Sequence, residues 1–158
     1  REVKVKPNVI SCTAGISACK KVGQWQRALL LLGELWEIRL EPDLSSYVAG
    51  ISACEQGGQW RPALSLLIQL REVELEPDVI SYSAGIRACQ NGEQWRGGLS
   101  LLRAMREVRL EPDVTSYSSA VGACDKSGHA MQVLSLLNEV GETFGRPSME
   151  RNHVAKKK

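Results

Sequence analysis

Apolar residues recur along the chain with the spacing of amphipathic helices. One stripe is formed by Tyr82, Gly85, Ile86 and Cys89. A second stripe is formed by Trp25, Ala28, Leu29, Leu32 and Leu35. Steps of three and four residues bring side chains to one side of a helix, so each stripe predicts a short helix with one buried face.

The whole pattern repeats every 35 residues, without an insertion or a deletion. The period is marked by Pro7, Pro42, Pro77, Pro112 and Pro147. The same register is kept by Cys19, Cys54, Cys89 and Cys124, by Trp25, Trp60 and Trp95, and by Gly15, Gly50 and Gly85. We number each repeat from position 1 to position 35, so that the prolines occupy position 34.

This numbering divides the chain into repeats at residues 9–43, 44–78, 79–113 and 114–148. The last repeat is divergent, because Ala130 replaces the tryptophan, Gly145 the leucine two residues before proline, and Ser148 the aspartate after it. The opening REVKVKPN aligns with REVELEPD and REVRLEPD, so residues 1–8 are interpreted as the end of a truncated preceding repeat. We expect a fragment of a longer array, followed by a disordered basic tail at residues 149–158.

Two helices per repeat, joined by short turns, predict the fold class. Polar links such as EQGGQ and QNGEQ contain glycine, which can take the left-handed conformation that closes a helix. LEPD then stops the second helix, since proline cannot continue it, and the aspartate can cap the next helix. Neither helix can bury its stripe alone, so neighbouring repeats must stack. We therefore predict an all-α fold, a right-handed α-solenoid of stacked helix-turn-helix repeats.

Two places depart from a regular array. Gly97 and Gly98 occur near the start of a second helix, where glycine costs about 1 kcal/mol relative to alanine. We expect this helix start to be the softest in the array. In the last repeat, we expect the second helix to fray towards Gly141.

Composition narrows the function only slightly. The chain has 43% hydrophobic and 24% charged residues among 158, which is ordinary for a soluble protein. No apolar run reaches the length of a membrane span, so we expect no membrane partner. The net charge of +2 is too small to predict a polyanionic partner, and any nucleic-acid binding must depend on a local surface.

No residue pattern predicts catalysis or a metal site. Four cysteines fall on the apolar stripe of a first helix and Cys12 takes a tyrosine position of that stripe, so all five are interpreted as buried hydrophobic residues. The chain has no C-x-x-C or H-x-E motif of the kind that zinc sites use. His129 and His153 lack an evident catalytic partner. We therefore expect no enzymatic activity, no cofactor and no small-molecule substrate.

The other side of each first helix, at positions 2, 5, 9 and 12, carries mostly small or hydroxylated residues. Such residues leave room for a flat ligand between successive repeats. They also let helices pack closely with no ligand at all. Periodicity alone leaves both interpretations open.

The sequence PDVISYSAGI, followed by AC, QW and the leucine-rich stripe, closely resembles the P-type pentatricopeptide repeat over residues 1–148. Tetratricopeptide repeats have 34 residues and a different signature, so they match less well. The resemblance implies binding of single-stranded RNA, one base per repeat, in mitochondria or plastids. It further implies a role in RNA processing, stability, editing or translation, with other RNA-processing proteins as candidate partners.

The resemblance also implies which residues read bases, because positions 5 and 35 of a repeat recognise one base in that family. The corresponding pairs are Thr13 with Asp43, Val48 with Asp78, Ser83 with Asp113, and Ser118 with Ser148. A short hydroxyl leaves room for a purine, and a carboxylate accepts from the N1–H and N2–H₂ groups of guanine. The first and third pairs are therefore expected to read guanine. The pair with Val48 is expected to discriminate poorly, and the fourth to favour adenine weakly.

Two further contacts follow from the resemblance. Position 2, which packs against the base planes, is occupied by Ile10, Ser45, Ile80 and Thr115. Position 13, where the family often has a phosphate-binding lysine, carries Lys21 and Lys126 in two of the four repeats. The alternative is a peptide-binding helical scaffold of the tetratricopeptide kind, without RNA binding.

Overall fold

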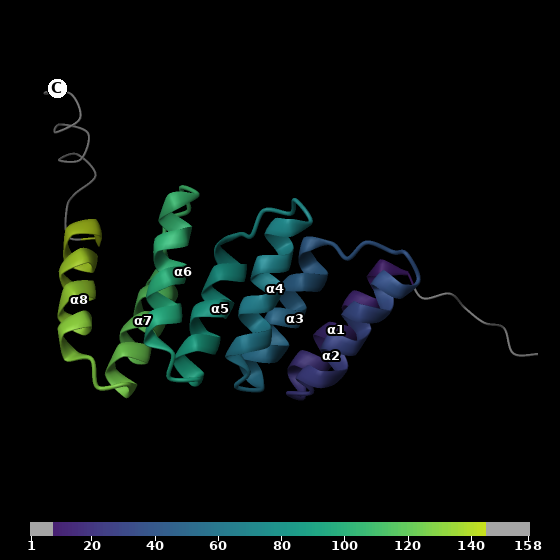
Figure 1. The fold of residues 1–158 in the computed structure, drawn as a ribbon, viewed down its shortest axis with the longest axis horizontal. Helices are drawn as coiled ribbons and strands as arrows, with labels where there is room; N and C mark the ends of the chain where they lie inside the picture. Colours follow the sequence, from purple (N-terminus) through teal and green to yellow (C-terminus); the bar gives the residue numbers. More distant parts are fainter. Residues whose placement is uncertain (1–7, 145–158) are drawn as a thin grey trace, which may run out of the picture.

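The computed structural model describes residues 8–144, which form eight α-helices and no strand (Figure 1). The helices are α1 (Val9–Lys21), α2 (Trp25–Glu37), α3 (Leu44–Gln56), α4 (Trp60–Glu72), α5 (Val79–Asn91), α6 (Trp95–Glu107), α7 (Val114–Lys126) and α8 (Ala130–Phe144). The predicted fold class, an all-α solenoid of stacked helix pairs, is confirmed. Apart from Asn8, the truncated repeat expected at residues 1–8 lies outside the described residues, as does the tail expected at residues 149–158.

The first helix of each repeat begins at a side-chain cap. Asp43, Asp78 and Asp113 precede α3, α5 and α7, and each carboxylate accepts a hydrogen bond from the backbone N–H three residues later. Asn8 caps α1 in the same way. These bonds satisfy N–H groups that have no partner inside the helix. The capping role predicted for the aspartate of LEPD is confirmed.

The helices end in turns that each contain one residue in the left-handed region. In three of the turns inside repeats this residue is Gly23, Gly58 or Gly128, with φ between 67° and 74°. In the third repeat it is Glu93, at φ 56°, whereas the preceding Gly92 has φ −90°. The expectation that the glycine of QNGEQ takes this conformation is therefore wrong. The linkers before proline use Arg39, Glu74 and Arg109, with φ from 59° to 62°.

The first helices form the inner row of the solenoid. In this row α1 contacts α3, α3 contacts α5, and α5 contacts α7, whereas the backbones of the described second helices do not approach one another as closely. Each second helix instead packs on the first helix of its own repeat and, up to α6, on that of the next repeat. Figure 1 shows the pairs stacked along the long axis, from α1 and α2 at one end to α8 at the other.

The core consists of the two predicted stripes. Side chains that are fully buried include Ile16, Ile51, Ile86, Leu35, Leu70 and Met105. Four of the five cysteines follow the prediction, because Cys12, Cys54, Cys89 and Cys124 are buried, whereas Cys19 is only half-buried. Burial raises the pKa of the Cys54 and Cys89 thiols to about 11, so both thiols stay protonated at neutral pH.

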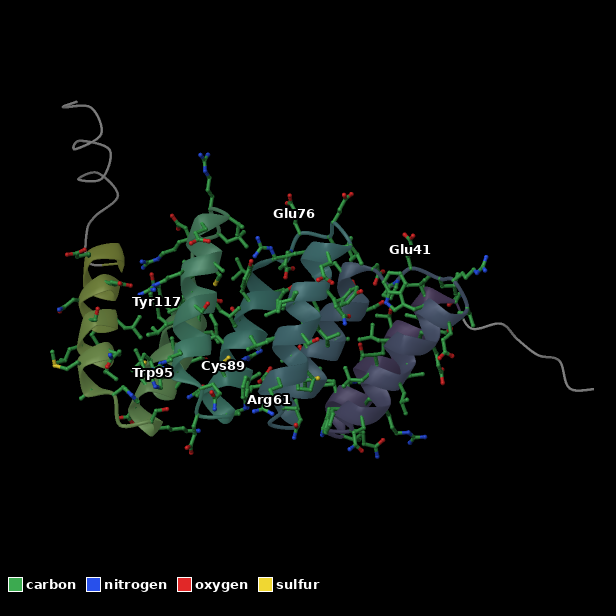
Figure 2. All side chains as sticks on the ribbon, viewed as in Figure 1. Glu41, Arg61, Glu76, Cys89, Trp95 and Tyr117 are labelled. Carbon is green, nitrogen blue, oxygen red and sulfur yellow. The ribbon has the colours of Figure 1, made fainter. Side chains whose placement is uncertain are left out.

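The tryptophans pack between successive repeats. In two interfaces the ring lies over a glycine of the next repeat, Trp25 over Gly57 and Trp60 over Gly92, with room for no side chain between them. In the fourth repeat Ser127 takes the place of that glycine, and Trp95, labelled in Figure 2, packs with a tilted ring on His129. The two ring centroids lie 4.2 Å apart. His129 therefore has a structural contact that the sequence alone did not reveal.

The two irregular places form complete helices. Despite Gly97 and Gly98, α6 begins at Trp95, in register with α2 and α4. The last helix continues through Gly141 to Phe144, so the expected fraying at Gly141 is not seen. None of the helices described is both long and apolar enough to cross a membrane.

Candidate nucleic-acid interface

The predicted base-reading residues lie together at the N-terminal ends of the first helices. Position 35 of a repeat caps the first helix of the next repeat. Position 5 lies one turn into the first helix of its own repeat, and that helix packs alongside the capped helix. At position 5, Thr13 and Val48 are half-buried, Ser83 is buried and Ser118 is exposed. At position 35, Asp43 and Asp113 are exposed and Asp78 is half-buried, whereas Ser148 lies outside the described residues. The structure thus brings the first three pairs to one edge of the inner row.

In the first pair, a serine joins the two predicted reading residues. The Thr13 Oγ1 atom lies 2.7 Å from Ser46 Oγ. Ser46 in turn donates to Asp43 Oδ1 through its backbone N–H, at 2.9 Å, and through its hydroxyl, at 2.8 Å. The cap of α3 and the position-5 hydroxyl therefore form one connected network.

The third pair repeats this arrangement. Ser83 Oγ lies 2.8 Å from Ser116 Oγ, which donates to Asp113 Oδ1 at 2.7 Å. Although burial alone would raise the pKa of Asp113, hydrogen bonds from Ser116 and Ser83 outweigh it and lower the pKa. The Asp113 carboxylate is therefore charged at neutral pH and can act only as an acceptor.

The second pair lacks the connection. Ser81 caps α5 through two bonds to Asp78 Oδ1, of 2.8 Å and 2.7 Å, as Ser46 and Ser116 do in their repeats. Val48, however, has no hydroxyl to continue the network. The second pair therefore differs from its neighbours in its hydrogen bonds, and its expected poor discrimination stays a prediction.

The side chains expected to pack against base planes are all exposed. Ile10 and Ile80 are 80% and 61% exposed, although both are large apolar residues on a helix. Ser45 and Thr115 are exposed as well. Exposed isoleucines at the same position of alternate repeats offer flat apolar surface beside the carboxylates, which suits contact with an aromatic base.

The expected phosphate-binding lysines lie farther along the same helices. Lys21 and Lys126 are exposed and occupy the last turns of α1 and α7. About 16 Å of helix separates position 2 from position 13, but side chains on a helix lean towards its N-terminus. A lysine side chain covers only part of that distance, so Lys21 and Lys126 can contact phosphate only where a ligand also runs along the helix.

An ion pair that the sequence analysis missed bridges two first helices. Glu55, on α3, lies 3.1 Å from Arg87, on α5, as measured between Oε2 and Nη2. Burial raises the pKa of Glu55 even though Arg87 and Lys20 act to lower it. The pair joins position 12 of one repeat to position 9 of the next, 32 residues on, and that spacing could have identified it.

The serines at position 3 were also missed. These serines recur in every repeat, as core residues do, so the sequence pattern does not distinguish them from the core. Ser46, Ser81 and Ser116 are fully buried, and their hydroxyls bond to the caps. Within residues 8–144, no three His, Cys, Asp or Glu side chains are grouped so that they could hold a metal ion.

Comparison with known structures finds the same fold in proteins that are bound to RNA. The pentatricopeptide repeat protein PPR10, in complex with an 18-nt psaJ RNA element, superposes with a TM-score of 0.78 at 23% identity, over 89% of this chain and 21% of PPR10. PPR10 from maize gives a TM-score of 0.51 at 19% identity, over 88% of this chain and 25% of that one. This chain thus spans about a fifth to a quarter of PPR10.

A second neighbour is the PPR domain of the Arabidopsis thaliana protein-only RNase P 1, in complex with tRNA. Its TM-score is 0.76 at 11% identity, over 98% of this chain and 81% of that domain's chain. At these identities the likeness establishes the fold. A comparison with curated proteins finds no match.

The family is shown by the sequence itself. The family model for the pentatricopeptide repeat domain matches residues 2–56, 40–92 and 65–127, in three overlapping segments. These segments contain the capped first helices α1, α3, α5 and α7 completely. The chain belongs to the pentatricopeptide repeat family.

Proposed function

We propose that this chain is a non-catalytic array that binds single-stranded RNA and reads one base per repeat. The observation that carries the proposal is the row of helix-capping carboxylates along one edge of the inner helices. Two of these carboxylates are linked to a position-5 hydroxyl. The row recurs with the 35-residue register of the sequence. A helical scaffold alone has no need for a hydroxyl at position 5.

The proposed reading follows from hydrogen-bonding capacity. Asp43 and Asp113, paired with Thr13 and Ser83, favour guanine, because guanine presents two adjacent donors at N1 and N2. Val48 gives the second repeat little discrimination. The RNA-bound neighbours PPR10 and the protein-only RNase P 1 domain support RNA as the ligand class. The organellar setting and the step of RNA metabolism stay predictions of the family resemblance.

The test replaces the hydroxyl of the third repeat. Ser83→Asn puts a larger amide, both donor and acceptor, at position 5, and we expect the preference at this repeat to move from guanine towards uracil. NMR titration with short RNAs that differ at one base registers this change even when binding is weak. Ser65→Asn, an exposed serine on α4, is the matched control and should leave the preference unchanged.

Two outcomes contradict the proposal in different ways. An unchanged base preference in a folded Ser83→Asn variant overturns the assignment of Ser83 as a reading residue. Absence of any salt-sensitive RNA binding favours the alternative scaffold, since contacts to phosphate weaken as salt rises.

A further inference from the structure

The structure assigns a third residue to the reading of a base. We propose that Ser116 at position 3 is a positioning residue, which fixes the proton of the Ser83 hydroxyl and thereby the acceptor surface offered to RNA. We call the chain of contacts Ser83, Ser116 and Asp113 the hydroxyl relay. This proposal rests on the proposed function and names the element that makes position 5 selective.

The direction of the relay follows from counting protons. Ser116 Oγ lies 2.7 Å from Asp113 Oδ1 and has a single proton to give. A charged acceptor makes the stronger bond, so that proton goes to the carboxylate. Ser116 Oγ can then only accept. The Ser83 hydroxyl proton has two acceptors on this side, Ser116 Oγ at 2.8 Å and Asp113 Oδ1 at 3.4 Å, and the shorter contact favours Ser116.

The surface that remains is made of acceptors. The Ser83 oxygen keeps a lone pair free once its proton is directed inward. The bonds to Asp113 from Ser83 and Ser116 all end on Oδ1, so Oδ2 takes part in none of them. Two acceptors on one edge suit a base edge with two adjacent donors, which guanine has and adenine lacks.

The first repeat contains a weaker version of the relay. Thr13 Oγ1 lies 2.7 Å from Ser46 Oγ and equally 2.7 Å from the Val9 carbonyl oxygen. One hydroxyl proton cannot satisfy both, and the Val9 carbonyl lies outside the relay, whereas both acceptors of Ser83, Ser116 Oγ and Asp113 Oδ1, belong to it. We therefore expect the first repeat to discriminate less sharply than the third.

The second repeat supplies an internal control. Ser81 makes the same two cap bonds as Ser116 and is equally buried, but the position-5 residue of the second repeat is Val48, which has no hydroxyl to orient. Ser81→Ala and Ser116→Ala each remove the hydroxyl bond to the cap, and Ser116→Ala also removes the bond to Ser83. Only Ser116→Ala removes a relay.

The first experiment compares these two variants by NMR titration with RNAs that differ at one base. Ser116→Ala should reduce the preference for guanine at the third repeat by about three- to tenfold, the effect of one hydrogen bond. Ser81→Ala should leave the preference at the second repeat unchanged. Equal changes in the two variants overturn the proposal, because they indicate a purely structural role.

The second experiment builds the relay where it is absent. Val48→Ser places a hydroxyl opposite Ser81 with the same 33-residue separation that joins Ser83 to Ser116. It should add a guanine preference at the second repeat, again about three- to tenfold. The double variant Val48→Ser/Ser81→Ala should lack that gain. A gain that survives Ser81→Ala overturns the positioning role.

A third measurement needs no RNA. Urea unfolding of Ser83→Ala, Ser116→Ala and the double variant should give non-additive shifts, because the two hydroxyls bond to each other. Additive shifts overturn the relay and leave the proposed function standing. Non-additive shifts with no RNA binding by the unsubstituted chain overturn the proposed function and, with it, the role of Ser116 in reading.

Discussion

At the scale of single residues, the aspartate after each proline has a structural role that leaves it available for a ligand. The cap bonds of Asp113 all end on one carboxylate oxygen, and the residue remains exposed. Hydrogen bonds hold its pKa below the ordinary value, so the group is charged without a cation beside it. One side chain can therefore start a helix and accept a hydrogen bond from a base.

The turn of the third repeat provides the first stability prediction. Glu93 takes φ 56° where the other repeats have glycine, and this conformation costs a residue with a Cβ about 1 kcal/mol or more. We expect Glu93→Gly to raise the free energy of unfolding by about 0.5–1 kcal/mol, after the greater entropy of glycine in the unfolded chain is subtracted. Urea unfolding measures the difference.

The matched control occupies the same position one repeat earlier. Gly58 has φ 67°, and a Cβ added to it would touch nothing within 4 Å, so Gly58→Ala tests conformation without crowding. That variant should lose about 1 kcal/mol. A Glu93→Gly variant less stable than the parent would show that the Glu93 side chain contributes more than its backbone costs.

Residue-scale features were only partly predictable from sequence. The caps were predicted because an aspartate acts on N–H groups three residues away, which is a local rule. The bond between Ser83 and Ser116 and the ion pair between Glu55 and Arg87 join different repeats. The partners in these contacts depend on how the first helices of successive repeats pack side by side. A rule about residues three or four positions apart does not predict that packing.

At the scale of helices, the 35-residue register predicted where the helices begin better than where they end. Every described second helix before α8 begins at tryptophan, as expected, even where Gly97 and Gly98 follow. Packing of the helix against its neighbours outweighs the low propensity of glycine there. The same effect explains why α8 continues through Gly141, where propensity alone suggested an end.

The glycine pair in α6 still lowers the free energy of unfolding, and a substitution can restore part of it. Gly98 is buried at the position of Ala28 and Ala63, and an added Cβ would meet Ala123, Cys89 and Ile86 at 3.9 Å, an ordinary contact distance. Gly98→Ala should therefore raise the free energy of unfolding by about 1 kcal/mol from helix propensity, and somewhat more from the buried methyl group. Thermal or urea unfolding tests this expectation.

Gly33 separates the two contributions. It lies inside α2, is exposed, and has nothing within 4 Å of an added Cβ, so Gly33→Ala reports propensity alone. Gly98→Ala should exceed Gly33→Ala. If it falls below Gly33→Ala, the space beside Ala123 is tighter than the 3.9 Å contacts indicate.

At the scale of the whole molecule, charge is distributed unevenly around a nearly neutral chain. The linkers that join successive repeats carry exposed glutamates such as Glu41 and Glu76, which Figure 2 shows along one edge. The inner row carries Lys20 and Arg87, but Glu55 lies between them. The row therefore has less free positive charge than its basic residues suggest.

Glu55 offers a way to change that balance without disturbing the fold. Burial raises its pKa, so the stability that the protonated form provides is present below the ordinary pKa of 4.5 and is lost as the pH rises above it. At neutral pH the charged Glu55 side chain therefore lowers the stability of the fold. Glutamine removes this destabilisation but loses the ion pair with Arg87. We expect Glu55→Gln to fold.

If RNA follows the inner row, Glu55→Gln should strengthen binding, because Arg87 loses its counter-ion and becomes available to phosphate. The plot of log K against log salt concentration should steepen by about 0.7, the value for one additional phosphate contact on a single strand. Glu139→Gln makes the same charge change on α8, where Glu139 pairs with Arg106 of a second helix at 3.3 Å. Glu139→Gln raises the net charge by the same amount but changes only the outer helices. Its slope of log K against log salt concentration should therefore equal that of the unsubstituted chain. Equal slopes for the two variants would mean that RNA responds to total charge, and that the inner row is not the path it takes.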